Sequence, residues 1–205
     1  MKSKQIILQS IDNQIEQCIF LIFSGGEIVG QGFIADGYFI TAAHVLTTFP
    51  ICLVNINSET INLSNEKPVY FEGNNSNDSE KLDVAIFRFG DISSSLHISK
   101  YIPQKGEKLV NCCMHEVIDT TSLNPQCKIT MVPAFPLREV EGNYFYCNCE
   151  RYGGSSGSPL LKNNEVVGIM YGGNDNGLCA FLMAKVIRKW IRFNPQSNIS
   201  EDVKQ

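Results

Sequence analysis

Short apolar runs, separated by glycine, asparagine, aspartate and serine, recur along most of the chain. This spacing is typical of the strands of an antiparallel all-β sandwich or barrel, and it does not resemble alternating strands and helices. In the first half, the runs occupy 18–23, 28–35, 38–46, 51–56 and 83–89. The polar stretch 73–80 has no apolar side chain to bury, so it predicts an exposed loop.

A second series of strand-like runs follows an irregular segment, 90–108, that contains Pro103 and Gly106. Its members are LVNCCMH, KITMVPAF, NYFYCNCE, EVVGIMYGG and CAFLMA. The segment 185–193 then places apolar side chains at helical intervals, which predicts a terminal helix packed on the body. We therefore expect an all-β protein with two antiparallel barrels, formed by residues 1–95 and 96–205, and a C-terminal α-helix.

The charge of the chain argues against nucleic acid as a partner. Its 205 residues include 17 Lys+Arg and 21 Asp+Glu, which gives a formal charge of −4, and there is no long basic run. No stretch approaches the length of a membrane span, and the N-terminus lacks the pattern of a secretion signal. We expect a protein that does not associate with membranes and works in the cytoplasm.

Eight cysteines allow two interpretations. Without a secretion signal, the thiols are expected to stay reduced and to act as small buried apolar groups. Alternatively, two short pairs could supply four tetrahedral zinc ligands, namely Cys113, His115, Cys147 and Cys149. We favour the first interpretation.

The stretch YGGSSGSPLL, 152–161, contains two adjacent candidate nucleophiles. A G-x-S-x-G pattern would make Ser155 the tip of a nucleophile elbow, whose catalytic groups follow the order Ser, acid, His. All three histidines, at positions 44, 97 and 115, precede the serines, so this interpretation fails. Ser156 is therefore the candidate nucleophile.

Acyl transfer by a serine requires a base within hydrogen-bonding reach and a carboxylate that orients the base. His44 ends an apolar run and follows Ala42 and Ala43, whose small side chains leave room for a ring. A histidine in such a place is, by itself, more often a packed core residue. Of the four aspartates between His44 and Ser156, only Asp83 precedes a strongly apolar strand, where a desolvated carboxylate could hold an imidazole or simply cap the strand.

Three segments together resemble the chymotrypsin-like (trypsin-like) serine peptidases: GQGFIADGYFITAAHVL, LDVAIFRF, and GGSSGSPLL followed by EVVGIMYGG. They occur in the same His, Asp, Ser order, and the resemblance extends from about residue 18 to about residue 192. Within this class, the chain is most similar to HtrA-type peptidases and bacterial glutamyl endopeptidases. The resemblance implies one peptidase domain of two six-stranded antiparallel β-barrels and a C-terminal α-helix.

The resemblance also assigns catalytic roles. It implies that His44 is the general base, Asp83 orients it and Ser156 is the nucleophile. The backbone N–H groups of Gly154 and Ser156 would form the oxyanion hole. No metal and no cofactor are expected, since Ser156 supplies the nucleophile and water completes the second half-reaction.

Substrate-binding positions follow from the same resemblance. The segment that pairs with the substrate backbone in the family corresponds to Tyr171, Gly172 and Gly173. Met170 stands where glutamyl endopeptidases have a histidine, and a thioether cannot donate to a carboxylate, so cleavage after Glu is disfavoured. Glu150 lies six residues before the nucleophile and would favour Arg or Lys. An apolar wall is expected from Leu178, Cys179 and Ala180, so we expect a preference for an apolar residue, with a basic residue second.

Four departures from the family pattern are informative. Ser155 replaces the aspartate that captures a new N-terminus in trypsin-type zymogens, so activation by N-terminal cleavage is not required. Val45 and Tyr152 stand where secreted members have disulfide cysteines, which supports a reducing compartment. Some viral members bind a structural zinc through two pairs of ligands, one of which follows the nucleophile. Here both pairs precede Ser156, so we expect no metal.

The sequence therefore predicts a serine endopeptidase that cleaves polypeptides through an acyl-enzyme. One alternative is a catalytically inactive peptide-binding module that keeps the substrate cleft. A second is an esterase acting on small substrates, for which the substrate-pairing segment would have no purpose. The sequence leaves the oligomeric state open.

Overall fold

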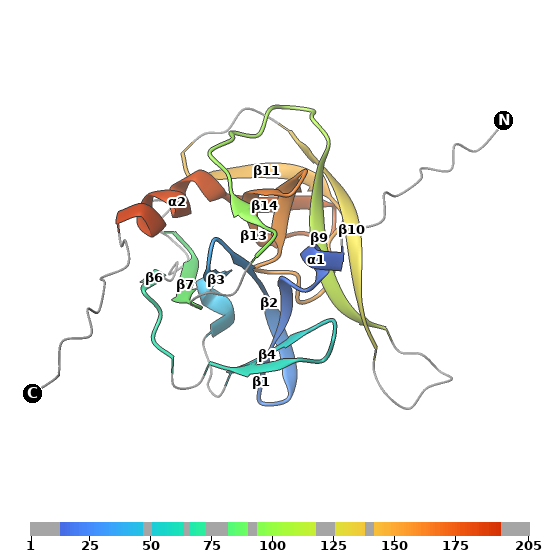
Figure 1. The fold of residues 1–205 in the computed structure, drawn as a ribbon. Coiled ribbons are helices and arrows are strands. Elements are labelled where there is room, and N and C mark those ends of the chain that lie inside the picture. The colour runs from blue at the N-terminus through green and yellow to red at the C-terminus, as the bar shows by residue number, and fades with distance from the viewer. Residues whose placement is uncertain are drawn as a thin grey trace, which may run out of the picture.

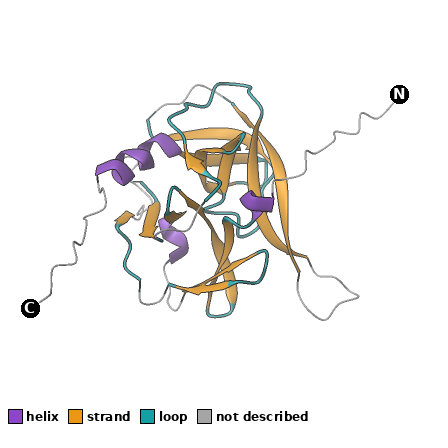
Figure 2. Cartoon of the chain, in the orientation of Figure 1, coloured by secondary structure: helices purple, strands orange, loops and turns teal. Residues whose placement is uncertain are grey.

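The computed structural model describes residues 13–46, 51–63, 66–72, 82–89, 94–117, 126–137 and 142–193. Most of them belong to strands, and Figure 2 shows how few helical segments accompany the strands. The helical elements are α1 (Asn13–Glu16), a 3-10 turn η1 (Ala43–Leu46) and α2 (Ala184–Phe193). The loop expected at 73–80 lies outside the described residues.

The first sheet is antiparallel throughout and has the order β5-β4-β1-β2-β3-β7-β6. Its strands are β1 (Ile19–Ser24), β2 (Glu27–Ala35), β3 (Tyr38–Thr41), β4 (Ile51–Asn55), β5 (Thr60–Asn62), β6 (Tyr70–Glu72) and β7 (Val84–Arg88). Within the described residues, its outer strands β5 and β6 do not pair with each other, so this sheet forms a half-barrel.

The second sheet has the order β12-β9-β10-β11-β14-β13-β8 and closes because β12 also pairs with β13. Its strands are β8 (His97–Ile98), β9 (Leu109–Val117), β10 (Gln126–Pro136), β11 (Tyr144–Cys149), β12 (Pro159–Lys162), β13 (Glu165–Gly173) and β14 (Leu178–Met183). Six strands form the closed barrel, and β8 adds to β13 in parallel. The predicted all-β double-barrel fold with a C-terminal helix is confirmed (Figure 1).

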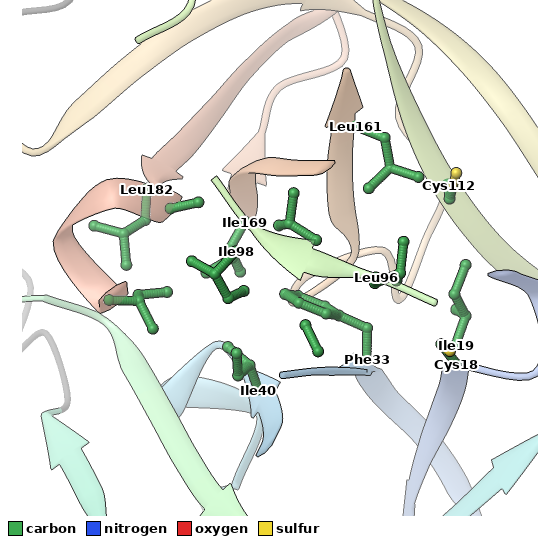
Figure 3. Close-up of a cluster of buried hydrophobic side chains, with 14 of the residues drawn as sticks. Cys18, Ile19, Phe33, Ile40, Leu96, Ile98, Cys112, Leu161, Ile169 and Leu182 are labelled. Atoms are coloured by element: carbon green, nitrogen blue, oxygen red, sulfur yellow. The ribbon is translucent and has the colours of Figure 1, made fainter. Parts of the chain in front are cut away.

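A shared hydrophobic core joins the two sheets. Phe33 and Ile40 of the first sheet belong to the same cluster as Ile169 and Leu182 of the second, and Figure 3 shows these side chains facing one another. Burial of each large aliphatic or aromatic side chain contributes about 1.5–3 kcal/mol, so this cluster holds the sheets together. Helix α2 adds Ile187 to the cluster.

Helix α2 also contacts the first sheet. Its Trp190 ring stacks on Tyr70 of β6, with ring centroids 4.4 Å apart. The C-terminal helix therefore spans the two halves of the fold. No helix in the part of the chain that the structure describes is long and apolar enough to cross a membrane.

Gln31 of β2 connects the two sheets by hydrogen bonds. Its side chain is fully buried, its Nε2 donates to Met114 O (2.6 Å), and its Oε1 accepts from Met114 N (2.9 Å). The main chain of Gln31 donates to Ser156 O (2.8 Å) and accepts from Thr41 Oγ1 (2.6 Å). One buried residue thus ties β2 to β9 and to the loop that carries the candidate nucleophile.

We expect Gln31→Met to destabilise the fold strongly. Methionine has a similar length but replaces neither hydrogen bond, so the N–H and C=O of Met114 would be buried without partners. Each unpaired group costs about 1–3 kcal/mol, so the free energy of unfolding should fall by roughly 2–5 kcal/mol in a denaturant titration. The matched control is Gln17→Met at an exposed position, expected to change it by less than about 0.5 kcal/mol. Equal stabilities of the two variants would contradict the role given to Gln31.

Candidate active site

The 3-10 turn η1 presents His44 directly after β3. Its other three residues, Ala43, Val45 and Leu46, are buried against the first sheet. The His44 side chain remains 42% exposed. The apolar residues around His44 therefore anchor the turn and leave the imidazole facing outward.

Asp83 fixes His44 in two ways. Its side chain is completely buried just before β7, and the pairing of Thr41 with Ala85 brings the ends of β3 and β7 together. Asp83 Oδ1 accepts from the backbone N of His44 (2.9 Å), and Oδ2 lies 2.5 Å from His44 Nδ1. A carboxylate at Nδ1 orients the ring and leaves Nε2 as the nitrogen that can take a proton.

Tyr144 of β11 supports Asp83 from the second sheet, and the sequence analysis did not identify it. Its hydroxyl accepts from the backbone N of Asp83 (2.9 Å). Its ring packs edge-on against Tyr171, with centroids 5.6 Å apart. Burial raises the pKa of Tyr144 to about 12, so the phenol stays neutral beside the carboxylate. Nothing in the local sequence marks this tyrosine, because its partner lies 61 residues away along the chain.

Two consecutive β-turns shape the loop around Ser156. In 152–155 and 155–158, the N–H of the fourth residue donates to the carbonyl of the first, at 3.2 and 3.1 Å. The third residues, Gly154 and Gly157, have φ of +73° and +90°, as a type II turn requires. Ser156 follows the first turn directly and occupies the second position of the next, where it remains partly exposed.

The loop brings Ser156 to the same junction as His44. Ser156 Oγ donates to Tyr171 O (3.3 Å), and the Tyr171 ring packs edge-on against the His44 ring with centroids 5.8 Å apart. A Cβ atom on Gly30 would lie 2.5 Å from Val45 Cγ1 and 3.0 Å from Ser156 O. Val45, the neighbour of His44, and the backbone of Ser156 therefore both pack against Gly30 of β2.

Two backbone donors are free at this loop. The N–H groups of Gly154 and Ser156 donate no hydrogen bond to any of the described residues. They are two residues apart in a loop with defined geometry, which is the arrangement needed to bind a developing oxyanion.

The end of β13, 171–173, lies beside the nucleophile loop. Asn174 N donates to Leu178 O of β14, so the alternation along β13 turns the N–H and C=O of Gly173 away from β14. Gly173 O accepts from Arg151 Nη1 (2.7 Å). The Arg151 guanidinium thus already binds Gly173 O, which is one of the acceptors expected to pair with a substrate.

A neighbouring surface cavity of about 400 Å³ is lined by Glu150, Arg151, Gly153, Asn174, Asp175 and Gly177. The residues that line it are charged residues, one asparagine and glycines, and Leu178 of the expected apolar wall is not among them. Met170 is fully buried, and its Sδ accepts from Asn111 Nδ2 (3.2 Å) inside the second barrel. The structure therefore brings Glu150 to the cavity and turns Met170 away from it.

Of the other two histidines, His97 pairs with Asp36 on the surface, at 2.8 Å, and the His115 ring stacks on Tyr152 of the nucleophile loop. All eight cysteines are free, and burial raises the pKa of Cys112, Cys113 and Cys147 to about 12, which keeps these thiols protonated at neutral pH. In the described ranges, no three His, Cys, Asp or Glu side chains are grouped so that they could hold a metal ion.

No family model and no curated protein matches this sequence. Solved structures do match. The Rv3671c protease of M. tuberculosis in an inactive form has a TM-score of 0.62 and 17% identity, and the match covers 88% of this chain and 90% of that one. Neuropsin, a serine protease from mouse brain, has a TM-score of 0.63 and 15% identity over 88% and 95% of the two chains. An inactivated protease paralogue of the scabies mite has a TM-score of 0.59 and 16% identity over 87% and 95%.

At these identities, the likeness shows a shared fold. This fold is the double β-barrel of the chymotrypsin-like serine proteases, and the matching structures include a protease in an inactive form and an inactivated paralogue. The finer resemblance to HtrA-type peptidases and glutamyl endopeptidases stays a prediction.

We expect Gly157→Ala to disrupt the nucleophile loop. A Cβ atom at this position would lie 2.0 Å from Gln31 O, and the φ of +90° is itself strained for alanine. The free energy of unfolding should fall by more than about 2 kcal/mol in a denaturant titration. Gly153→Ala is the control, because its Cβ would meet nothing within 4 Å. A Gly157 variant as stable as the Gly153 variant would show that the loop is not held against β2.

Proposed function

We propose that this protein is a serine endopeptidase in which His44, Asp83 and Ser156 form the catalytic triad. The observation that carries the proposal is the double contact of the buried Asp83 carboxylate with the backbone N–H and the Nδ1 of His44. A buried carboxylate in such a position is costly unless it is paired, and here its partner is an exposed imidazole next to the nucleophile loop.

The reaction follows from the positions of these groups. Ser156 Oγ turns from Tyr171 O to His44 Nε2, gives up its proton there and attacks the substrate carbonyl. The N–H groups of Gly154 and Ser156 stabilise the oxyanion of the tetrahedral intermediate. The imidazolium then protonates the leaving amine, and water, deprotonated by His44, releases the acyl group.

The substrates we propose are polypeptides, in keeping with the protease fold of the structural neighbours. The substrate chain would lie as an added strand along 171–173. The peptidase domain that we propose has two halves, residues 1–95 and 96–205. They meet where the triad and the segment 171–173 lie. The cavity at Glu150 takes the side chain before the cut. Its lining holds the carboxylates of Glu150 and Asp175 and one guanidinium, that of Arg151, so the remaining negative charge favours a basic side chain over the apolar one expected from the sequence.

Eight free cysteines support the proposal that the protein works in a reducing compartment such as the cytoplasm.

One observation favours a second candidate function, an inactive peptide-binding module. In the described structure, Ser156 Oγ donates to Tyr171 O and not to His44. An inactivated protease is also among the structural neighbours.

A fluorophosphonate probe that labels activated serines distinguishes the two functions. We expect the wild type to be labelled, Ser155→Ala to retain the labelling, and Ser156→Ala to lose it, because only Ser156 is served by His44 and the free N–H groups. Gel fluorescence and mass spectrometry of the modified peptide measure the result. Absence of labelling in a folded wild type would support the peptide-binding module, and labelling of Ser155 would contradict the proposed triad.

We expect Arg151→Ala to improve substrate binding. Its guanidinium competes with the substrate for Gly173 O, and one exposed hydrogen bond of this kind is worth roughly 0.5–1.5 kcal/mol, so KM should fall by about 2- to 10-fold with kcat unchanged. Steady-state kinetics with peptides that extend over Gly173 measure the effect. An alanine ester, which reaches neither Gly173 nor the charged groups of the cavity, serves as the control and should show no change. An increased KM for the peptides would show that Arg151 binds the substrate.

A further inference from the structure

Tyr152 and His115 form a stacked pair beside the oxyanion loop. Their rings are 2° from parallel, and their centroids are 5.2 Å apart. Tyr152 begins the turn 152–155, and its carbonyl accepts the hydrogen bond from Ser155 N that closes this turn. The place of the Tyr152 main chain therefore determines where the turn directs the N–H of Gly154.

His115 belongs to a continuously paired part of the second sheet. It lies on β9, whose pairing with β10 extends over nine residue pairs and includes His115 opposite Lys128. His115 Nδ1 is buried and has no hydrogen-bond partner among the described residues. A buried polar atom without a partner costs folding free energy, so the ring is not held there by hydrogen bonding of this nitrogen. The face of the ring packs against Tyr152.

The two donors of the oxyanion hole are held in different ways. The segment 156–158 is fixed by backbone hydrogen bonds from Gln31 N to Ser156 O (2.8 Å) and from Gly157 N to Met170 O (2.7 Å). From residue 151 to residue 154, by contrast, no main-chain group is bonded to any described residue outside the turn. Apart from the hydrogen bond of the Arg151 side chain to Gly173 O, the Gly154 side of the loop therefore depends on side-chain packing.

Packing holds this side of the loop from two directions. On one side, the Tyr152 ring rests on His115 of β9. On the other side, Ile28 Cγ2 of β2 lies 3.2 Å from the position that a Cβ on Gly154 would take. Burial raises the pKa of Tyr152, which keeps its hydroxyl neutral at this contact. The turn thus lies between the two sheets: the stack on His115 contacts it from the second sheet, and Ile28 contacts it from the first.

We propose that Tyr152 and His115 are positioning residues, whose stacked rings hold the turn 152–155 in the conformation that directs the N–H of Gly154 toward the oxyanion. The consequence for catalysis rests on the proposed function. Substrate binding along 171–173 does not involve the stack, and only Gly153 of the turn lines the proposed side-chain cavity, so loss of the stack lowers kcat more than it raises KM.

The kinetic test compares alanine with phenylalanine at both positions. Loss of a whole oxyanion donor costs about 10²–10³-fold in turnover, and a loosened donor should cost roughly 10- to 100-fold in His115→Ala and Tyr152→Ala. His115→Phe and Tyr152→Phe keep a stacking ring and should restore kcat to within about 3-fold of the wild type. His97→Ala removes an exposed histidine and is the control for the alanine variants. Equal losses in kcat and in substrate affinity in all four variants would overturn the proposal.

A second measurement does not depend on activity. The amide of Ser155 is protected from hydrogen exchange only while its bond to Tyr152 O keeps the turn closed. NMR-detected exchange at Ser155 should be faster in both alanine variants and close to the wild-type rate in the phenylalanine variants. Unchanged exchange in both alanine variants overturns the positioning role, whether or not the protein cleaves peptides. Failure of the wild type to react with the serine probe would instead contradict the proposed function alone.

Discussion

The buried main chain and side chain of Gln31 are the constraint on which the site depends. β2 runs next to β3, and His44 follows β3 directly, so any segment fixed to β2 at this level comes to lie close to His44. Gln31 fixes the loop of Ser156 there, through a main-chain hydrogen bond and through contact too close for a side chain at Gly157. Its amide also saturates the N–H and C=O of Met114, which would otherwise be buried without partners.

The hydrogen bonding around Asp83 depends on the same docking of the two sheets. The carboxylate contacts His44 within the first sheet, whereas the backbone N–H of Asp83 donates to Tyr144 of the second. A buried donor at the edge of the first sheet is thus satisfied only when the barrels are assembled. Docking therefore fixes Asp83 and His44 in place at the same time as it brings in Ser156, the proposed nucleophile.

The strands, the terminal helix and the placement of His44 and Ser156 could be predicted because each depends on local pattern or on a short motif. Tyr144 could not be predicted, since its role depends on which strand ends meet across the two sheets. The burial of Met170 could not be predicted for a different reason. The register between β13 and β14 shifts between Met170 and Gly172, so Tyr171 is an extra residue on β13. Such a bulge changes the side to which neighbouring side chains point, and the sequence does not reveal where it occurs.

How the turn 152–155 is held depends on which residues this chain has at positions 152 and 155. In the proteases that it resembles, a disulfide cysteine stands at the position of Tyr152 and, in trypsin-type zymogens, an aspartate at that of Ser155. Tyr152 and Ser155 provide neither a covalent link nor an ion pair, so in our proposal the aromatic stack holds the turn. A stack contributes about 0.5–1.5 kcal/mol beyond the area that it buries, far less than a disulfide, which typically contributes about 2–4 kcal/mol. The Gly154 turn is therefore held more weakly than a disulfide would hold it, and on this proposal substitutions there change turnover without affecting the core.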